Sequence, residues 1–185
     1  MKKVLFIDFE DSFSFNVVQE LTEIGLKVDV ISWTEFKSVS EHDLLVIGPG
    51  PGHPDDYHYI FDVLRDWQKA GKKMFGICLG HQILWRLKGS EVVKSAFPVH
   101  GQKIKLILNS SWQEWLNLPS EIWVQSYNSL AVVDSVSDGS IENMVENGEI
   151  IMSRSPQFIS YQFHPESVGT KCRESFFRPI LRDLL

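Results

Sequence analysis

The sequence has few cysteines, no excess of basic residues and no long apolar run, and each shortage excludes a class of protein. Two cysteines, Cys78 and Cys172, occur in 185 residues, which is too few for a disulfide framework or a cysteine-rich metal site. The formal net charge is −6, so binding to nucleic acid or to an anionic membrane gains no favourable electrostatic term. No stretch approaches the roughly 18 to 20 apolar residues of a membrane span. We therefore expect neither a nucleic-acid partner nor a membrane.

The N-terminus lacks a signal-peptide pattern, because Asp8 follows the short run Val4–Ile7 before a hydrophobic segment of the needed length is complete. Isolated cysteines also suit a reducing compartment, so we expect a cytoplasmic protein. The apolar share of 43% is enough for a buried core, and the length predicts one domain over residues 1–185.

Short apolar runs alternate with amphipathic stretches in the first half of the chain. The runs lack polar alternation, which predicts strands buried on both faces of a parallel sheet. These strands are Val4–Ile7, Val28–Ser32, Leu44–Ile47 and Met74–Ile77. Helices are predicted at Phe15–Ile24 and Tyr57–Ala70, because a glycine follows each amphipathic stretch. The expected inward face of the first helix is Phe15, Val18, Leu21 and Thr22.

The second half contains strand-like runs separated by turn-rich pieces. These runs are Ile104–Leu108, Ile122–Gln125, Leu130–Val133, Ile141–Val145, Ile150–Ser153 and Phe158–Phe163. Asp138-Gly139 and Asn147-Gly148 are typical of hairpin turns, so antiparallel pairing is predicted here. A last helix is predicted over Glu174–Leu184, with Pro179 as a possible kink. The fold class is therefore α/β: a mostly parallel central sheet flanked by helices, with a smaller antiparallel sheet.

Cys78 stands in a glycine frame, with Gly76 two residues before it and Gly80 two residues after it. The frame follows an apolar strand and leads into a helical stretch, which is typical of a nucleophile elbow. A thiol at a helix N-terminus also experiences the positive end of the helix dipole, which favours the thiolate. The alternative is a buried cysteine between two packing glycines. The strand-then-helix setting favours the nucleophile.

A cysteine nucleophile needs a base, and the base needs an orienting group. His164 and Glu166 stand two residues apart on either side of Pro165. On an extended segment two such side chains project to the same side, so Glu166 can fix the tautomer of His164. Together with Cys78 they form a candidate triad in the order Cys, His, Glu.

The segment Gly48–Pro54 follows the third predicted strand and alternates glycine with proline. A phosphate-binding loop is excluded, because prolines lack the N–H groups that such a loop supplies. The N–H groups of Gly50 and Gly52 remain on a stiff backbone, which suits a substrate clamp and an oxyanion donor. A rigid turn without a function is the alternative. The place beside a strand end, where such sheets bind ligands, favours function.

Three of these segments together resemble class I (triad-type) glutamine amidotransferases: Gly48–Pro54, Gly76–Gln82 and Phe163–Ser167. Further motifs narrow the resemblance to the glutaminase component (component II) of anthranilate synthase and of aminodeoxychorismate, or para-aminobenzoate, synthase. They are Ile7-Asp8, Asp11-Ser12-Phe13, Asn16, Val99-His100-Gly101 and Tyr127 with Ser129-Leu130. The motifs occur in the family's order from residue 7 to residue 170.

The resemblance implies a role for each motif residue. Cys78 is implied as the nucleophile, His164 as the acid-base and Glu166 as its orienting group. The N–H groups of Gly52 and Leu79 are implied to form the oxyanion hole. The residues implied to hold glutamine are Gly50, Pro51, Gly52, Gln82, Ser129 and Leu130. The histidines show no metal-ligand spacing, so no metal ion and no cofactor are expected.

Two segments depart from the family pattern. Residues 126–130 read Ser-Tyr-Asn-Ser-Leu, where the family usually has Arg-Tyr-His-Ser-Leu. Residues 8–13 read Asp-Phe-Glu-Asp-Ser-Phe, where the family usually has Asp-Asn-Tyr-Asp-Ser-Phe. Both departures are expected near the face that meets a partner.

The resemblance implies an enzyme that hydrolyses glutamine to glutamate and ammonia through a Cys78 thioester. The ammonia would pass to a partner chain, a chorismate-using synthase subunit (component I) that makes anthranilate or aminodeoxychorismate. Three alternatives stay open: delivery to another acceptor synthetase, a stand-alone hydrolase of γ-glutamyl compounds, and a non-catalytic regulatory homologue.

Overall fold

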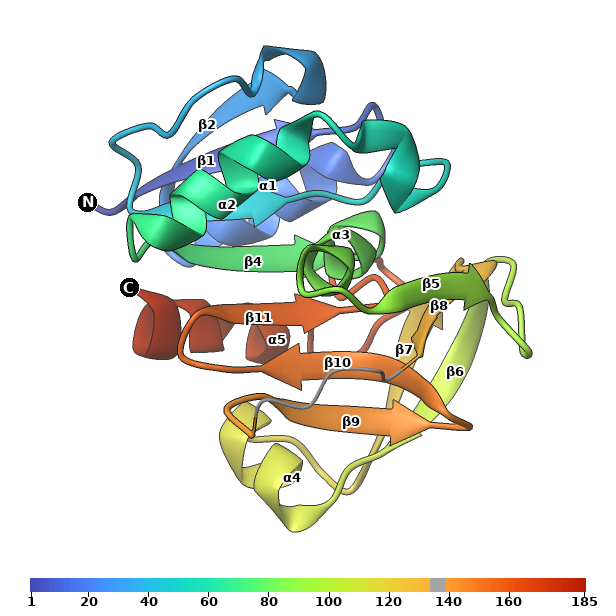
Figure 1. The fold of residues 1–185 in the computed structure, drawn as a ribbon. Coiled ribbons are helices and arrows are strands. Elements are labelled where there is room, and N and C mark those ends of the chain that lie inside the picture. Colours follow the sequence, from blue (N-terminus) through green and yellow to red (C-terminus); the bar gives the residue numbers. More distant parts are fainter. Residues whose placement is uncertain (134–138) are drawn as a thin grey trace.

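The computed structural model describes residues 1–133 and 139–185 and confirms the α/β fold class. Parallel strands form one half of the main sheet in the order β2-β1-β3-β4-β11 (Figure 1). Their bounds are Lys27–Ser32 (β2), Lys3–Asp8 (β1), Leu44–Ile47 (β3), Lys73–Ile77 (β4) and Phe158–Tyr161 (β11). The C-terminal ends of β3, β4 and β11 therefore lie side by side, which is where open parallel sheets carry their sites.

Antiparallel strands continue the same sheet beyond β11, in the order β10-β8-β5, with β9 also paired to β10. Their bounds are Glu149–Arg154 (β10), Leu130–Val133 (β8), Glu91–Lys94 (β5) and Glu142–Glu146 (β9). A separate antiparallel pair joins β6 (Gln102–Ile107) to β7 (Glu121–Ser126). The predicted hairpin at Asn147-Gly148 is confirmed between β9 and β10, with φ of 52° and 82°. The other predicted hairpin falls on Asp138, which lies outside the described residues.

Helices cover both faces of the parallel half (Figure 1). One face packs on α1 (Ser14–Glu23) and α5 (Arg173–Pro179), and the other on α2 (Ile60–Lys69) and α3 (Leu79–Leu87). Alternate residues of β1 face opposite sides of the sheet. Phe6 packs in the core cluster that includes α1 and α5, and Ile7 packs in the cluster that includes α2 and α3. This alternation confirms the prediction of strands buried on both faces, for β1, β3 and β4. Within the described ranges, every helix is too short or too polar to cross a lipid bilayer.

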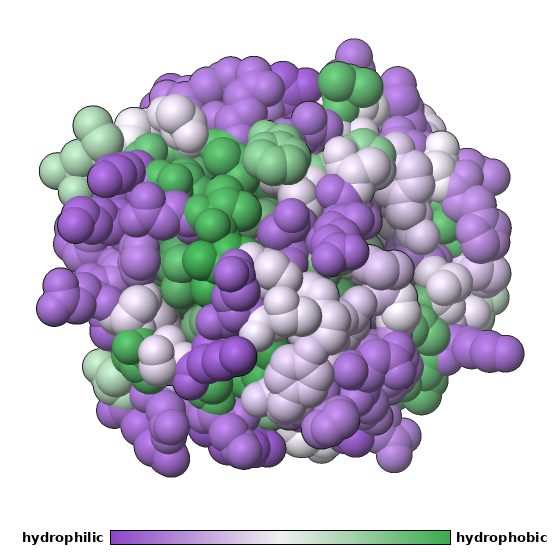
Figure 2. Space-filling view, turned by 90° about the horizontal axis from the view of Figure 1, so that it is seen from above, coloured by the Kyte–Doolittle hydropathy of each residue, from purple (hydrophilic) through white to green (hydrophobic). Residues whose placement is uncertain are grey.

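The prediction was wrong for the strand at Val28–Ser32. β2 is the edge of the sheet and Val30 is 40% exposed. Figure 2 looks onto the molecule from this side and shows an apolar area bordered by polar side chains. Composition alone cannot distinguish an apolar edge strand from a central strand, because the position at the edge depends on the order of the strands in the sheet.

The predicted inward face of α1 was wrong at Phe15 and Thr22, which are exposed, and right at Leu21, which is buried. Phe15 is 71% exposed, and the buried positions are Ser14, Val17, Glu20 and Leu21. The buried stripe is thus displaced by one residue from the predicted one. The Glu20 carboxylate can be buried because it forms an ion pair with Arg173 at 2.6 Å.

The strand β5 and the helix α4 (Ser110–Leu116) were not predicted. Both are short, and α4 is defined by its ends: Asn109 caps it and Asn117 closes it at φ 53°. The last helix is confirmed, and Pro179 marks a change in its hydrogen bonding. Beyond α5 the chain continues as a π-helical segment, Ile180–Leu184, and the change falls at Pro179, which has no backbone N–H to donate.

A fully buried histidine ties α3 to the sheet. His81 Nε2 lies 3.1 Å from the carbonyl oxygen of Ile150, and Nδ1 lies 2.8 Å from Ser160 Oγ. A carbonyl only accepts, so Nε2 carries the hydrogen and Nδ1 accepts from the hydroxyl. Burial lowers the pKa of His81 from 6.5 to about 3, although the hydrogen bond to Ile150 opposes this shift.

We expect the contribution of His81 to the free energy of unfolding to fall as the pH drops below 6.5. The unfolded chain then binds a proton at His81 that the folded chain does not bind, which costs about 2 kcal/mol at pH 5. His164, whose pKa is raised on folding, acts in the opposite direction, and its effect cancels when two proteins that both retain it are compared. Urea unfolding at pH 7 and pH 5 measures the difference: the wild type should lose about 2 kcal/mol more than His81→Gln. Equal losses in the two proteins would contradict the assignment to His81.

Candidate active site

Cys78 occupies a strained turn between β4 and α3. Its φ of 52° and ψ of −104° lie outside the usual regions for a residue with a side chain. The turn is fixed from both sides, because the Cys78 N–H donates to Tyr161 O at 2.8 Å and its carbonyl accepts from Gln82 N–H at 3.1 Å. Strain of this kind persists only where the surrounding structure determines it, and it is common at functional sites. The predicted strand-turn-helix geometry of an elbow is thus present.

The two framing glycines are required by close backbone contacts. A Cβ on Gly76 would lie 2.7 Å from the carbonyl carbon and oxygen of Gly80. A Cβ on Gly80 would lie 2.0 Å from the backbone oxygen of Ile47, at the end of β3. The first turn of α3 therefore packs directly on the sheet, and this packing sets the position of the thiol.

His164 and Glu166 follow β11, the strand next to β4, so they lie beside Cys78. His164 Nδ1–H donates to Glu166 Oε1 at 2.7 Å, and each residue is 2% exposed. The other carboxylate oxygen, Glu166 Oε2, is buried without a partner among the described residues. The histidine backbone is fixed as well, because its N–H donates to Gln125 O and its carbonyl accepts from Thr170 Oγ1 at 2.7 Å.

The charges around His164 favour its protonated form. Burial is the largest influence and alone would lower the pKa of His164. The charge and hydrogen bond of the Cys78 sulfur, with the hydrogen bond and charge of Glu166, outweigh it and raise that pKa well above 6.5. An imidazolium beside the sulfur stabilises a thiolate, which is the nucleophilic form of cysteine.

Two aromatic rings pack against the imidazole of His164. The ring centroids of Phe13 and Tyr127 lie 5.1 Å and 5.0 Å from the imidazole, and 5.0 Å from each other. Tyr127 is 37% exposed, so this pair forms a partly open cover over the base. Sequence reasoning placed both residues in family motifs but gave neither a role.

The loop after β3 packs on the elbow. A Cβ on Gly50 would lie 2.6 Å from Leu79 Cδ2, and Gly52 has a φ of 77°. The Tyr57 hydroxyl donates to the carbonyl oxygen of Pro51 at 2.8 Å. In a trans peptide the next N–H points opposite to that carbonyl, so Tyr57 also fixes the direction of the Gly52 N–H.

The Gln82 side chain is nearly buried and links α3 to β8 and to the residue that follows β11. Its Nε2 donates to Leu130 O at 3.3 Å and to Gln162 Oε1 at 3.1 Å. Gln162 in turn directs Nε2 at Cys78 Sγ, 3.9 Å away. Sequence reasoning missed Gln162, and no local signal identifies it, because the contact depends on β11 lying next to β4. The Ser129 carbonyl accepts from Ser95 N–H and shares no described contact with Gln82.

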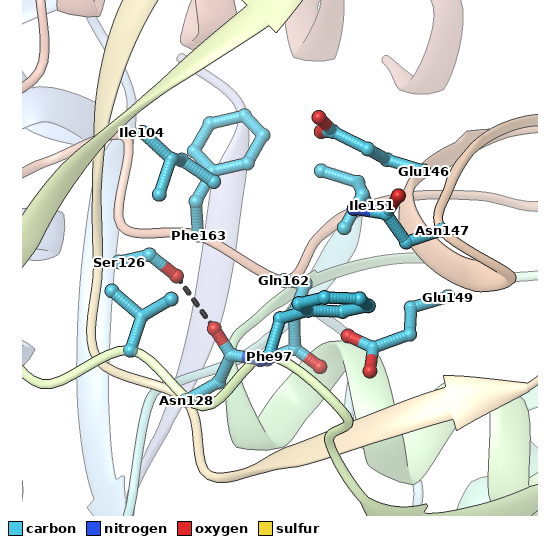
Figure 3. A pocket seen from close by; sticks show the side chains of 11 residues that line it. Phe97, Ile104, Ser126, Asn128, Glu146, Asn147, Glu149, Ile151, Gln162 and Phe163 are labelled. Carbon is cyan, nitrogen blue, oxygen red and sulfur yellow. Dashed lines mark hydrogen bonds between the residues drawn. The ribbon is translucent and has the colours of Figure 1, made fainter.

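The departures at Ser126 and Asn128 lie inside the protein. They are 1% and 8% exposed, while Tyr127 between them is 37% exposed, so of the three only Tyr127 presents much of its surface; the expected nearness to a partner face stays a prediction. Figure 3 shows the Ser126 hydroxyl bonded to the Asn128 side chain, beside a cavity of about 110 Å³ that Gln162 also lines. In the described ranges, no group of three or more His, Cys, Asp and Glu side chains is arranged to hold a metal ion.

This arrangement brings a thiol, an imidazole and a carboxylate together at one edge of the sheet, and comparison with known families shows which family shares the chain's sequence pattern. Residues 5–184 match the family model "Glutamine amidotransferase class-I". The chain therefore belongs to the class I glutamine amidotransferases, which confirms the resemblance found in the sequence.

Individual relatives show which members of this family the chain is similar to. The chain is 32% identical to an aminodeoxychorismate/anthranilate synthase component 2 of Bacillus subtilis, over 98% of this chain and 95% of that protein. It is 29% identical to a phenazine-specific anthranilate synthase of Pseudomonas chlororaphis over its full length, but spans only 30% of that longer protein. Among solved structures, a glutamine amidotransferase from Thermotoga maritima shares the fold with a TM-score of 0.73 at 17% identity, over 99% of this chain and 84% of that one. A protein named as a GMP synthase component, from Thermoplasma acidophilum, has a TM-score of 0.81 at 21% identity, over 100% and 94% of the two chains.

Proposed function

We propose that this chain hydrolyses glutamine to glutamate and ammonia through a thioester on Cys78, and delivers the ammonia to a chorismate-using synthase. The observation that carries the proposal is the line of thiol, imidazole and carboxylate built from Cys78, His164 and Glu166. Backbone hydrogen bonds hold Cys78 and His164, and Glu166 is bonded to the His164 imidazole, so the line is preorganised.

In the first half of the reaction, the Cys78 thiolate attacks the γ-carboxamide carbon of glutamine. The carbonyl oxygen becomes an oxyanion, which the N–H groups of Gly52 and Leu79 stabilise. When the intermediate collapses, the carbon–nitrogen bond breaks and His164 gives its proton to the departing ammonia. A Cys78 γ-glutamyl thioester remains.

In the second half, His164 is neutral and accepts a proton from water. The hydroxide attacks the thioester, glutamate leaves, and the Cys78 thiolate and the imidazolium are restored. Glu166 keeps the imidazole in one tautomer and stabilises its charged form in both halves.

A direct assay separates catalysis from the alternatives. Purified protein with glutamine should release glutamate and ammonia in equal amounts, and hydroxylamine should intercept the thioester as γ-glutamyl hydroxamate. A non-catalytic homologue would release neither, with or without a partner. A γ-glutamyl hydrolase would prefer γ-glutamyl peptides to free glutamine.

The names of the relatives support a chorismate-using partner. The test adds candidate synthase chains, with chorismate, to the protein at equal concentration. A stable complex by gel filtration and a faster release of glutamate with one of these chains would identify the partner. Activation by a synthetase for a different acceptor would overturn the choice of chorismate while leaving the glutaminase chemistry intact.

Gln82→Ala should raise the KM for glutamine by roughly 10-fold or more, because it leaves a polar group of the substrate unpaired in a buried site. Gln82 Oε1 accepts none of the described hydrogen bonds, so it is free to accept from the α-ammonium of glutamine. Ammonia bypasses this pocket, and the ammonia-dependent reaction of the reconstituted synthase should be unchanged. Gln157→Ala, at an exposed glutamine, is the control. An unchanged KM in Gln82→Ala would remove Gln82 from the substrate site.

A further inference from the structure

We propose that Gln162 directs its amide N–H at the sulfur of Cys78 and stabilises the thiolate, and that Gln82 holds Gln162 in that orientation. The inference rests on Cys78 as the nucleophile and adds one residue that acts on the thiol, Gln162, and one positioning residue, Gln82. It gives Gln82 a second task besides holding substrate.

The orientation of the amides follows from one carbonyl group. Leu130 O can only accept, so the group of Gln82 that lies 3.3 Å from it must be the NH₂. The same Gln82 Nε2 lies 3.1 Å from the Gln162 side chain, which must therefore present its oxygen there. Gln162 is then left with its NH₂ toward Cys78 Sγ, at 3.9 Å. A donor facing sulfur favours the thiolate over the thiol.

The amide of Asn128 also donates to that carbonyl. Asn128 Nδ2 donates to Leu130 O at 3.1 Å, and its Oδ1 accepts from the Ser126 hydroxyl at 2.6 Å. Ser126 and Asn128, at which residues 126–130 depart from the family pattern, are therefore bonded to each other, and Asn128 is also bonded to the carbonyl that orients Gln82. Figure 3 shows Ser126, Asn128 and Gln162 around one cavity. The side chains that make these bonds, Ser126, Asn128, Gln82 and Gln162, are nearly buried, so water competes little for the bonds.

The charged neighbours of the thiol are few among the described residues. His164 contacts the sulfur from the segment after β11, and Glu166 lies behind it. On α3, His81 is bonded to Ile150 and Ser160 and remains neutral near pH 7. On the loop after β3, His53 is bonded to Val92 O. A neutral amide on Gln162 thus adds to the effect of His164 without a charge of its own.

Alkylation of Cys78 by iodoacetamide tests the proposal without any need for glutamine turnover. The Cys172→Ser background leaves one thiol, and intact-protein mass gives the rate of modification as a function of pH. Gln162→Met keeps the length of the side chain and removes the donor. We expect the pH of half-maximal rate to rise by about half a unit to one unit, so that alkylation below it slows roughly 3- to 10-fold.

Matched variants separate this effect from a general disturbance. Gln82→Met, which does not touch the sulfur, should shift the profile in the same direction, and the double variant should shift it no further than Gln162→Met alone. Gln162→Glu should shift it more, because a carboxylate adds negative charge, and it serves if Gln162→Met does not fold. Gln157→Met, at the exposed position preceding β11, should match the parent.

An unchanged profile in Gln162→Met and Gln162→Glu would overturn the proposal. A shift with Gln162→Met but none with Gln82→Met would overturn the part assigned to Gln82. If the protein proves to have no glutaminase activity, the alkylation profiles still decide the question, so the two failures are distinguishable.

Discussion

Cys78→Ala and Cys78→Ser are expected to lower glutamine hydrolysis by roughly 10³-fold or more, because neither side chain supplies a thiolate at neutral pH. The structure gives no substitute nucleophile within the described residues: Cys172 is exposed and begins α5 on the opposite layer from α3. Release of glutamate at saturating glutamine measures the loss. The ammonia-dependent reaction of the reconstituted synthase should survive in both variants, because free ammonia does not need the thiol, and gel filtration of the complex checks that the variants still fold and bind.

Cys172→Ser provides the control, since it removes the only other thiol in the chain. Wild-type turnover is expected, because no described contact joins its side chain to the candidate triad. Comparable losses in the Cys78 and Cys172 variants would mean that the nucleophile has been misassigned.

Most of the fold could be predicted because local composition determined it. Buried parallel strands read as continuous apolar runs, and β1, β3 and β4 were located from such runs alone. The run of β11 was also located, but antiparallel pairing was predicted for it, whereas it pairs parallel with β4 and antiparallel only with β10. Strand order is not local, and that is why β2 was taken for a central strand. β5 was missed for a related reason: its four residues, Glu91–Lys94, are mostly exposed and are a strand because β8 pairs with them.

The residues of the candidate site likewise divide into those that local sequence predicts and those that it does not. Cys78 with its glycines, and His164 with Glu166, lie within short motifs whose spacing determines their geometry. Gln162 and Tyr57 act across elements, one through the pairing of β11 with β4 and the other through a loop that folds back on Pro51. No spacing in the sequence encodes these contacts. The catalytic roles of the triad stay a prediction until the variants are measured.

Gly80→Ala should be among the most destabilising single substitutions in this protein. The added Cβ would lie 2.0 Å from the backbone oxygen and 2.7 Å from the backbone carbon of Ile47, and neither atom can rotate away as a side chain could. Either α3 shifts off the sheet or β3 moves at the centre of the parallel half. We expect a loss of about 4 kcal/mol or more, at the upper end of the range for overpacked cores.

Thermal unfolding measures this loss, and Gly25→Ala is the matched control. Gly25 has a φ of 89°, and no atom lies within 4 Å of the place that a Cβ would take, so alanine there carries only backbone strain, about 1 kcal/mol. For a chain of this length Gly80→Ala should lower the Tm by about 10 °C or more and Gly25→Ala by only a few degrees. The same shift of α3 would displace both Cys78 and Gln82, so any Gly80→Ala protein that remains folded should have lost most of its glutaminase activity. A Gly80→Ala protein with the stability and turnover of the wild type would show that contact between α3 and β3 does not position the thiol.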